Sequence, residues 1–157
     1  MKHHHYNIQV EWVGNDGDGT KTYQSYRRDY TFSAAGKQSI ECSSDPGFRG
    51  DAKRYNPEEL LVASLSSCHM LWYLHLCSTN GISVEAYSDN AAGTMEETSD
   101  GFGEFVRVVL RPTVLIAAGN DTTRALELHG EAHRYCFIAR SVRFPVDCSP
   151  EIIESTK

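Results

Sequence analysis

The segment from residue 56 to residue 81 constrains the fold more than any other part of the sequence. It opens with Asn56-Pro57-Glu58-Glu59, continues as a mainly apolar run, and stops at Asn80-Gly81. Asparagine is a favoured N-cap, proline fits the first helical position, and acidic side chains stabilise the positive end of a helix. Glycine is a common helix stop. The sequence therefore predicts one long helix over residues 57–79.

The apolar side chains of this helix are distributed almost all round it, which predicts a central position in the core. The run is a poor membrane span because polar side chains interrupt it. These are Ser64, Ser66, Ser67, His69 and His75.

The rest of the chain predicts strands before and after this helix, and one further helix. Segments 6–13, 20–32, 38–42, 82–87, 104–118 and 141–146 have strand patterns, and segment 120–135 has the pattern of a helix. Strands that do not alternate regularly with helices favour an α+β fold over a doubly wound one. We expect a single domain, 1–157, with a His-rich tail at residues 1–5.

Composition excludes several classes of partner. The 157 residues carry a formal net charge of −6 with scattered basic residues, so neither nucleic acid nor an anionic membrane is an expected partner. The N-terminus lacks the apolar stretch of a secretory signal. We expect a soluble, cytoplasmic protein.

Five isolated cysteines are the first candidates for chemistry: Cys42, Cys68, Cys77, Cys136 and Cys148. Their odd number and the lack of a C-x-x-C pair argue against a disulfide framework or a thioredoxin motif. Each is then either a small core residue or a reactive thiol. Because Cys77 lies on the opposite helix face from Cys68, and Cys42 and Cys148 lie at chain positions without a motif, we expect these three to be structural.

Cys68 is too far along the helix for the N-terminal dipole to stabilise its thiolate. A reactive Cys68 would need another stabilising group, most simply an arginine. Glu58 also lies on this helix, but ten residues from Cys68, which is roughly 15 Å along the axis and about 80° around it. If both belong to one site, a second copy of the helix must supply the other residue, which predicts a homodimer.

A metal site is the weaker alternative. His129 and His133 share one face of the second predicted helix, His69 and His75 lie near Cys68, and the ligand set could include Cys68 or Cys136. No metalloprotease-type glutamate separates the His129–His133 pair. We therefore expect no metal and no cofactor.

Two motifs carry a family resemblance. Residues 56–61 followed by Ala63-Ser64-Leu65-Ser66-Ser67-Cys68 resemble the Asn-Pro-Glu-x-Leu…Cys helix of the OsmC/Ohr family, named for an osmotically inducible protein and for organic hydroperoxide resistance. Downstream, Ala132-His133-Arg134-Tyr135-Cys136 resembles its second-cysteine segment. With the expected order of strands and helices, the resemblance covers most of the chain. Phe137 stands where organic hydroperoxide resistance proteins usually have proline.

The resemblance implies a fold and a reaction. The fold would be an antiparallel sheet packed on a long central helix in an intertwined homodimer. The reaction would be reduction of organic hydroperoxides, with Cys68 as the peroxidatic thiol and Cys136 as the resolving thiol. Glu58 would hold an arginine, and the loop before the helix resembles the family most closely around Arg49. The alternative arginines are Arg54, Arg27 and Arg28.

We therefore interpret the chain as a two-cysteine hydroperoxide reductase. Cys68 would become a sulfenic acid and then a disulfide with Cys136, which an external dithiol, a small molecule or a protein, would reduce. The enzyme would need no cofactor and would belong to the oxidative stress response. The alternative is a non-catalytic protein on the same fold that binds a small apolar ligand.

Overall fold

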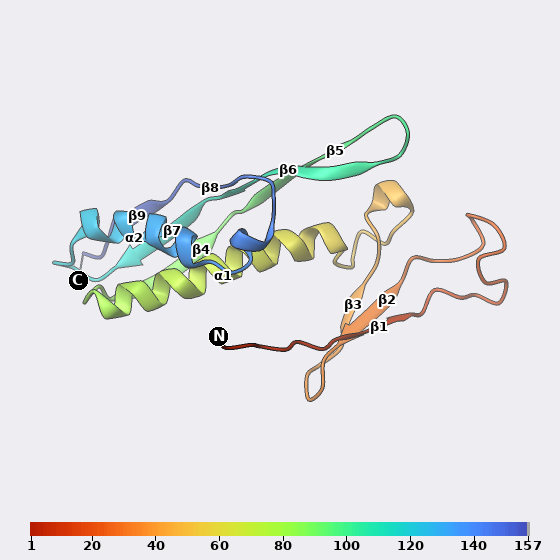
Figure 1. The fold of residues 1–157 in the computed structure, drawn as a ribbon, viewed down its shortest axis with the longest axis horizontal. Coiled ribbons are helices and arrows are strands. Elements are labelled where there is room, and N and C mark those ends of the chain that lie inside the picture. The colour runs from red at the N-terminus through yellow and green to blue at the C-terminus, as the bar shows by residue number, and fades with distance from the viewer. Residues whose placement is uncertain (157) are drawn as a thin grey trace. The chain divides into compact units, whose positions relative to one another are not determined.

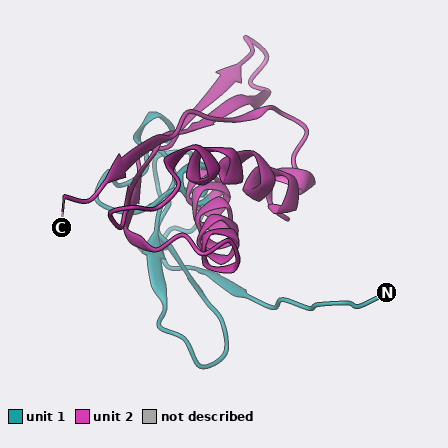
Figure 2. Ribbon diagram, turned by 90° about the vertical axis from the view of Figure 1, so that its left-hand side faces the viewer, with its two compact units in different colours: residues 1–60 teal, residues 61–157 magenta. Residues whose placement is uncertain are grey.

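The computed structural model describes residues 1–156 and falls into two compact units, Met1–Leu60 and Leu61–Lys157 (Figures 1 and 2). The boundary between the units lies within the long helix, shortly after its start. The expectation of one domain over 1–157 stays a prediction.

Unit 1 contains a small antiparallel sheet with the strand order β1-β2-β3. The strands are β1 (Gln9–Trp12), β2 (Tyr30–Ser33) and β3 (Ile40–Cys42). All three overlap predicted strands. After β3, a short 3-10 helix, η1 (Pro46–Phe48), interrupts the predicted loop.

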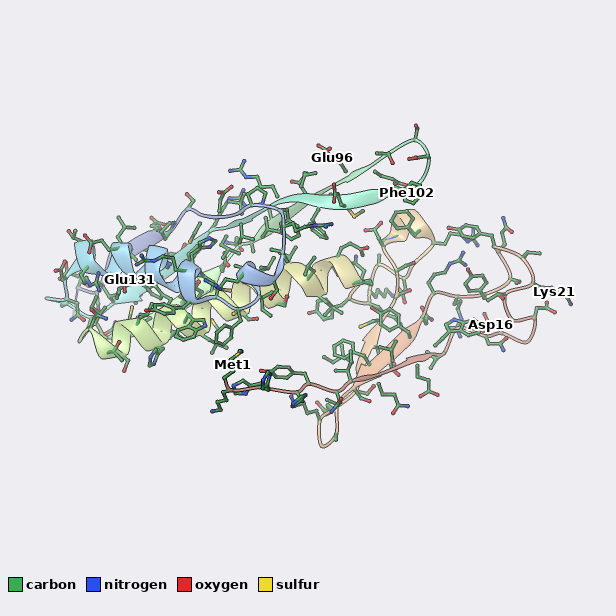
Figure 3. The ribbon with its side chains drawn as sticks, in the orientation of Figure 1. Met1, Asp16, Lys21, Glu96, Phe102 and Glu131 are labelled. Carbon is green, nitrogen blue, oxygen red and sulfur yellow. The ribbon has the colours of Figure 1, made fainter. Side chains whose placement is uncertain are left out.

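The prediction that the whole of 20–32 forms a returning strand is wrong, because this segment pairs with β1 only from Tyr30 onward. The residues before it form turns, and the Arg28 guanidinium lies over the rings of Tyr23 and Tyr26, 4.3 and 4.0 Å from their centroids. Cation–π contacts of this kind stabilise a compact loop. The tyrosines that suggested a strand are used in this loop; Figure 3 marks its position with Asp16 and Lys21.

Helix α1 spans Pro57–Thr79, as predicted. Its N-terminus is a capping box, in which Asn56 Oδ1 accepts from the Glu59 backbone N–H at 2.8 Å and Glu59 Oε2 accepts from the Asn56 N–H at 3.1 Å. At the other end Gly81 takes a φ of 72°, and the Ile82 N–H donates to the Cys77 carbonyl at 2.9 Å. Local sequence therefore sets both helix ends.

Only one stripe of α1 is buried within the described chain. Its buried residues are Leu65, His69, Tyr73 and Cys77, while Leu71 on another face is 62% exposed. The expectation of burial all round the helix is therefore not met by the described residues of a single chain. By length and composition alone α1 could cross a membrane, but this is weak evidence, because the core helix of a soluble protein passes the same test.

Unit 2 contains two mixed sheets. One has the order β4-β7-β9, formed by β4 (Val84–Asp89), β7 (Pro112–Ile116) and β9 (Glu151–Glu154). The other has the order β5-β6-β8, formed by β5 (Ala92–Glu97), β6 (Gly103–Leu110) and β8 (Val146–Cys148). The pairs β4–β7 and β5–β6 are antiparallel, whereas β7–β9 and β6–β8 are parallel.

The predicted antiparallel sheet is thus confirmed only in part for unit 2, because each sheet also has a parallel pair, formed where the chain returns to a sheet after a long crossover. Here the crossover contains the second helix. The predicted strand 104–118 is divided at Arg111, whose N–H donates to Asp89 Oδ1 at 2.7 Å. The predicted strand 141–146 is also wrong, since the 3-10 helix η2 (Ala139–Ser141) precedes β8, which begins only at Val146. Strands β5 and β9 were not predicted; Figure 3 labels Glu96 and Phe102 on the β5–β6 hairpin.

Helix α2 spans Thr122–Tyr135, and Asp121 caps it by accepting from the Arg124 N–H at 2.9 Å. Its buried face contacts α1 and β7 in one apolar cluster that includes Tyr73, Val114 and Leu128. A second cluster joins α1 to strands β6 and β8 around Leu65, Val108, Leu110 and Val146. These two clusters place the middle of α1 against the C-terminal end of α2 and the end of β8.

Candidate functional site

The fold brings the two predicted thiols together within unit 2. Cys68 is half-buried in the middle of α1, and Cys136 is buried at the end of α2. The Cys136 N–H still donates to the Ala132 carbonyl at 2.9 Å, but its ψ of 108° turns the chain out of the helix. The two thiols are close enough for Cys68 to raise the pKa of Cys136.

The environment of Cys136 favours the neutral thiol. Burial raises its pKa to about 11, the Ala139 N–H that donates to the sulfur at 3.4 Å opposes this, and Cys68 raises the pKa further through its hydrogen bond and its charge. At neutral pH Cys136 therefore carries a proton that it can donate to the sulfur of Cys68.

Three aromatic rings pack beside this pair. Trp72, one turn after Cys68, stacks on Tyr135 at 5.1 Å between centroids and meets Phe137 edge-on at 5.6 Å. Tyr135 and Phe137 flank Cys136 in the chain, so these contacts fasten the end of α2 to α1. Phe137 is 66% exposed, which leaves an apolar surface next to the thiols.

Glu58 belongs to unit 1. Its Oε2 atom is buried and has no hydrogen-bond partner among residues 1–156. Burial is the largest cause that raises the pKa of Tyr30 to about 12, and the charges of Cys42 and Glu58 contribute to the same shift. An unpaired buried carboxylate oxygen is costly and is ready to accept from a donor such as an arginine.

The four candidate arginines also belong to unit 1 and differ in their partners. Arg27 is paired with Asp16 and Asp29, at 3.1 and 2.7 Å, and Arg28 is enclosed by the tyrosines described above. Arg54 makes two long ion pairs, of 3.6 and 3.9 Å, and its buried NH1 atom has no partner within the described chain.

Arg49 is exposed and has no ion pair among the described residues. It caps η1 with a φ of 66°, the one positive value at a non-glycine residue between 1 and 156. Strained backbone of this kind is concentrated at functional sites. Arg54 thus has an unpartnered NH1 atom, and Arg49 has a distant contact with the Tyr23 ring, at 5.9 Å, whereas Arg27 and Arg28 are held by several close partners.

A second cluster in unit 2 joins His69, His129 and Cys148. Sequence reasoning had considered both histidines, but with His75, His133, Cys68 and Cys136 as companions. His75 is exposed and lies outside the cluster. Cys148, expected to be incidental, stands at the end of β8 beside both imidazoles. Its parallel pairing with β6, which brings it there, leaves no local mark in the sequence.

Comparison with known proteins supports the resemblance. The family model described as OsmC-like protein matches residues 50–151. The chain belongs to the OsmC-like family. An OsmC-like protein of unknown function from Vibrio cholerae is 35% identical, with 96% of this chain and 100% of that chain covered and a TM-score of 0.85. The uncharacterized protein YmaD of Bacillus subtilis (strain 168) is 22% identical, with 96% of this chain and 95% of the relative covered.

Some OsmC-like structures with the same fold have functional names. One from Legionella pneumophila is described as an organic hydroperoxide resistance protein OsmC and predicted redox protein; it is 19% identical over 94% of this chain and 96% of its own, with a TM-score of 0.65. At this identity the likeness establishes the fold alone. The family match contains Glu58, Cys68, Cys136 and Arg54, and begins one residue after Arg49.

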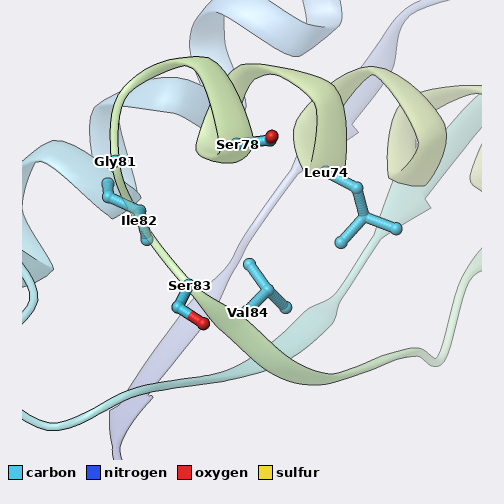
Figure 4. Close-up of a pocket in the computed structure, with 6 residues that line it drawn as sticks. All are labelled: Leu74, Ser78, Gly81, Ile82, Ser83 and Val84. Carbon is cyan, nitrogen blue, oxygen red and sulfur yellow. The ribbon is translucent and has the colours of Figure 1, made fainter.

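An open hollow lies at the end of α1 in this OsmC-like chain, lined by Leu74, Ser78, Gly81, Ile82, Ser83 and Val84 (Figure 4). None of the predicted site residues lines it. It is therefore a surface feature and not the candidate site.

Proposed function

We propose that this protein is a thiol-dependent peroxidase that reduces organic hydroperoxides to alcohols. The observation that supports this proposal most is that the fold brings Cys136, buried at the end of α2, close enough to the half-buried Cys68 for Cys68 to raise its pKa. Membership of the OsmC-like family, some of whose structures are named organic hydroperoxide resistance proteins, agrees with it.

The proposed reaction begins with the Cys68 thiolate. Its sulfur attacks the peroxide O–O bond, which releases an alcohol after protonation and leaves a sulfenic acid on Cys68. The Cys136 sulfur then displaces the hydroxyl as water and forms a disulfide. An external dithiol reduces the disulfide and restores both thiols.

The coupling between the two thiols supports this order of events. Part of the raised pKa of Cys136 comes from the hydrogen bond and charge of Cys68. When Cys68 becomes a neutral sulfenic acid, that contribution disappears and Cys136 loses its proton more easily. In this proposal, the Cys136 thiol therefore forms its reactive thiolate more readily after Cys68 has been oxidised than before.

Activation of Cys68 is assigned to an arginine held by Glu58. Arg49 is our first candidate because it has no ion pair in the described chain and a strained backbone, and Arg54 is the alternative because of its unpartnered NH1. The guanidinium would stabilise the Cys68 thiolate and the charge that develops on the leaving oxygen.

The apolar surroundings of Cys68 favour alkyl hydroperoxides over hydrogen peroxide. The side chains concerned are Leu61, Leu71 and Trp72 on α1, together with Tyr135 and Phe137; Leu65 on the same helix is fully buried in the core. Leu71, Tyr135 and Phe137 are 62%, 51% and 66% exposed. Alkyl groups that cover such surface gain free energy from burial, which hydrogen peroxide cannot.

We also propose that the enzyme acts as a homodimer in the cytoplasm. On one straight helix Glu58 and Cys68 are too far apart to share a site, so the Glu58–arginine pair that serves each Cys68 would come from a second copy.

Replacement of single cysteines tests the mechanism. We expect Cys68→Ser to abolish peroxide consumption, and Cys136→Ser to keep one fast turnover but lose recycling. Cys77→Ser is the matched control, because Cys77 is a buried thiol on the same helix and should be dispensable. Mass spectrometry after peroxide should show a Cys68–Cys136 disulfide in the unmodified protein and added oxygen on Cys68 in Cys136→Ser.

Other results would reject the proposal. Sulfinic acid on Cys68 with Cys136 still free in the unmodified protein would exclude the two-cysteine mechanism. No loss of free thiols after one equivalent of an organic hydroperoxide would instead favour the non-catalytic binding protein.

A further inference from the structure

The cluster of His69, His129 and Cys148 brings three metal-binding atoms within 4.8 Å of one another. His69 Nε2 and His129 Nδ1 are 3.0 Å apart, and Cys148 Sγ lies 3.6 Å from the first and 4.0 Å from the second. The three residues come from α1, α2 and β8, so tertiary packing and not local sequence assembles them.

These separations match the edges of a metal-centred tetrahedron. With zinc–nitrogen bonds of about 2.0–2.1 Å and zinc–sulfur bonds of about 2.3 Å, tetrahedral ligands stand about 3.3 Å apart for two nitrogens and about 3.5 Å apart for nitrogen and sulfur. The three observed distances each lie within about 0.5 Å of these values. Without a metal, a hydrogen bond joins the two imidazoles, and weaker contacts of the Cys148 sulfur reach both inner nitrogens.

The two imidazoles are in the neutral state that binds a metal, whereas Cys148, whose pKa burial raises to about 12, must release its proton to solvent when zinc binds. Burial lowers the pKa of His69 to about 4 and that of His129 to about 3, so both rings are neutral at neutral pH. Only one nitrogen of each ring has a partner, since His69 Nδ1 and His129 Nε2 are buried without one in the part of the chain that the structure describes. Each inner nitrogen can bind a metal once the proton of the ring has moved to the outer nitrogen.

The site is rigid, as a preformed metal site should be. The His129 ring stacks on Tyr73 at 3.8 Å between centroids, and the Tyr73 hydroxyl donates to the Ala125 carbonyl at 3.1 Å. The nearby carboxylate of Asp89 is already engaged, because its two oxygens accept from the Ser66 hydroxyl and the Arg111 N–H. The protein thus offers three ligands, and a fourth position is left for water or another small ligand.

We propose that His69 Nε2, His129 Nδ1 and Cys148 Sγ form a zinc site in this protein. Two imidazoles and a thiolate suit zinc, whereas magnesium and calcium prefer oxygen ligands. The site departs from our sequence-based expectation of no metal, and it uses neither Cys68 nor Cys136. It therefore stands or falls independently of the peroxidase proposal.

Metal retention tests the site, in full-length reduced protein with His3, His4 and His5 replaced by alanine, because that tail could bind metal itself. After stripping with a chelator, addition of zinc and gel filtration, we expect one zinc per chain. Cobalt(II) in place of zinc should give the thiolate-to-cobalt charge-transfer band and the intense visible bands of a tetrahedral ion.

Matched variants locate the bound ion. Cys148→Ser should abolish the charge-transfer band, and Cys148→Ser and His129→Gln should each weaken zinc binding by about 100-fold or more. Cys77→Ser and Cys68→Ser should bind as the parent does. Circular dichroism identifies any variant that does not fold. If a variant does not fold, the charge-transfer band in the cobalt spectrum of the parent still shows whether a thiolate binds the metal.

Three outcomes would overturn the proposal. The first is a parent protein that retains no zinc and gives no cobalt charge-transfer band. The second is a Cys148→Ser variant, folded or not, whose zinc binding equals that of the parent. The third is retention of copper without zinc, which would show that the cluster selects a different metal.

Discussion

At the scale of single residues, burial keeps most of the sulfur and imidazole groups of unit 2 uncharged. It raises the pKa of Cys77, that of Cys136 to about 11 and that of Cys148 to about 12, and it lowers the pKa of both cluster histidines. Cys136 differs from the other two raised thiols because part of its shift depends on Cys68. A thiol whose pKa depends on its reaction partner suits a resolving role.

The histidine pair makes stability depend on pH. In the unfolded chain a histidine has a pKa of about 6.5, whereas in the folded protein the pKa is about 4 for His69 and about 3 for His129. For His69 burial is the largest cause, the charge of His133 adds to it, and Asp89 opposes it. As pH falls below about 6.5, these two imidazoles become protonated in the unfolded chain but stay neutral in the folded protein, and this lowers the unfolding free energy. Stability is therefore full above pH 6.5 and is lost toward pH 4.

Between pH 7 and pH 5, we expect each of these imidazoles to lower the unfolding free energy by about 2 kcal/mol, because it becomes protonated only in the unfolded chain. Urea denaturation at the two pH values, with a chelator present, measures the loss. His129→Gln should lose about 2 kcal/mol less than the parent over that interval. The exposed His75→Gln is the control and should follow the parent; equal pH dependence in all three proteins would contradict the assignment.

At the scale of elements, α1 is the part that connects the two units and carries Cys68. Its N-terminus depends on the capping box of Asn56 and Glu59, and Asn56 is buried, 6% exposed. Pro57 and Glu58 follow this cap in the first turn of the helix. Loss of the cap would therefore also displace the Glu58 carboxylate, which is proposed to hold the activating arginine.

We expect Asn56→Ala to lower the unfolding free energy by about 1 kcal/mol, because the Glu59 N–H loses its acceptor in a buried place. Urea denaturation at neutral pH provides the measurement. Asn7→Ala, at an exposed residue outside regular structure, is the matched control and should change stability by less than about 0.5 kcal/mol. Equal effects of the two substitutions would mean that the cap contributes nothing.

At the scale of the whole molecule, the described chain leaves apolar surface uncovered in each unit. In unit 1 every residue of β1 is exposed, with Val10 at 60% and Trp12 at 43%. In unit 2 the exposed face of α1 includes Leu71. Exposed apolar surface on a strand and on a helix is typical of chains that assemble with another copy.

We expect the protein to sediment as a dimer, at twice its chain mass of 17.6 kDa, at micromolar concentration. Leu71→Glu should shift the equilibrium toward monomer, because a charge would be buried in the interface. Leu126→Glu, at an exposed leucine of α2, is the control. A stable monomer of the unmodified protein would remove both the dimer and the shared site.

The sequence by itself determined the features that depend on neighbouring residues. The bounds of α1 follow from Asn56, Pro57 and Gly81, which act within one turn of the helix ends. The two cysteine motifs predicted the family, which the family match confirms, and the pairing of Cys68 with Cys136 stays a prediction. The sequence also indicated the second helix, since Asp121 caps it locally.

Only the tertiary structure decided the rest, because those features join residues distant in the chain. The parallel pairing of β8 with β6 follows a long crossover, and it is this pairing that carries Cys148 to His69 and His129. The turns at residues 20–29 replaced a predicted strand because Arg28 binds Tyr23 and Tyr26 through side chains that strand propensity does not describe. Propensity and capping act over a few residues, whereas a metal-binding cluster depends on where three separate elements meet.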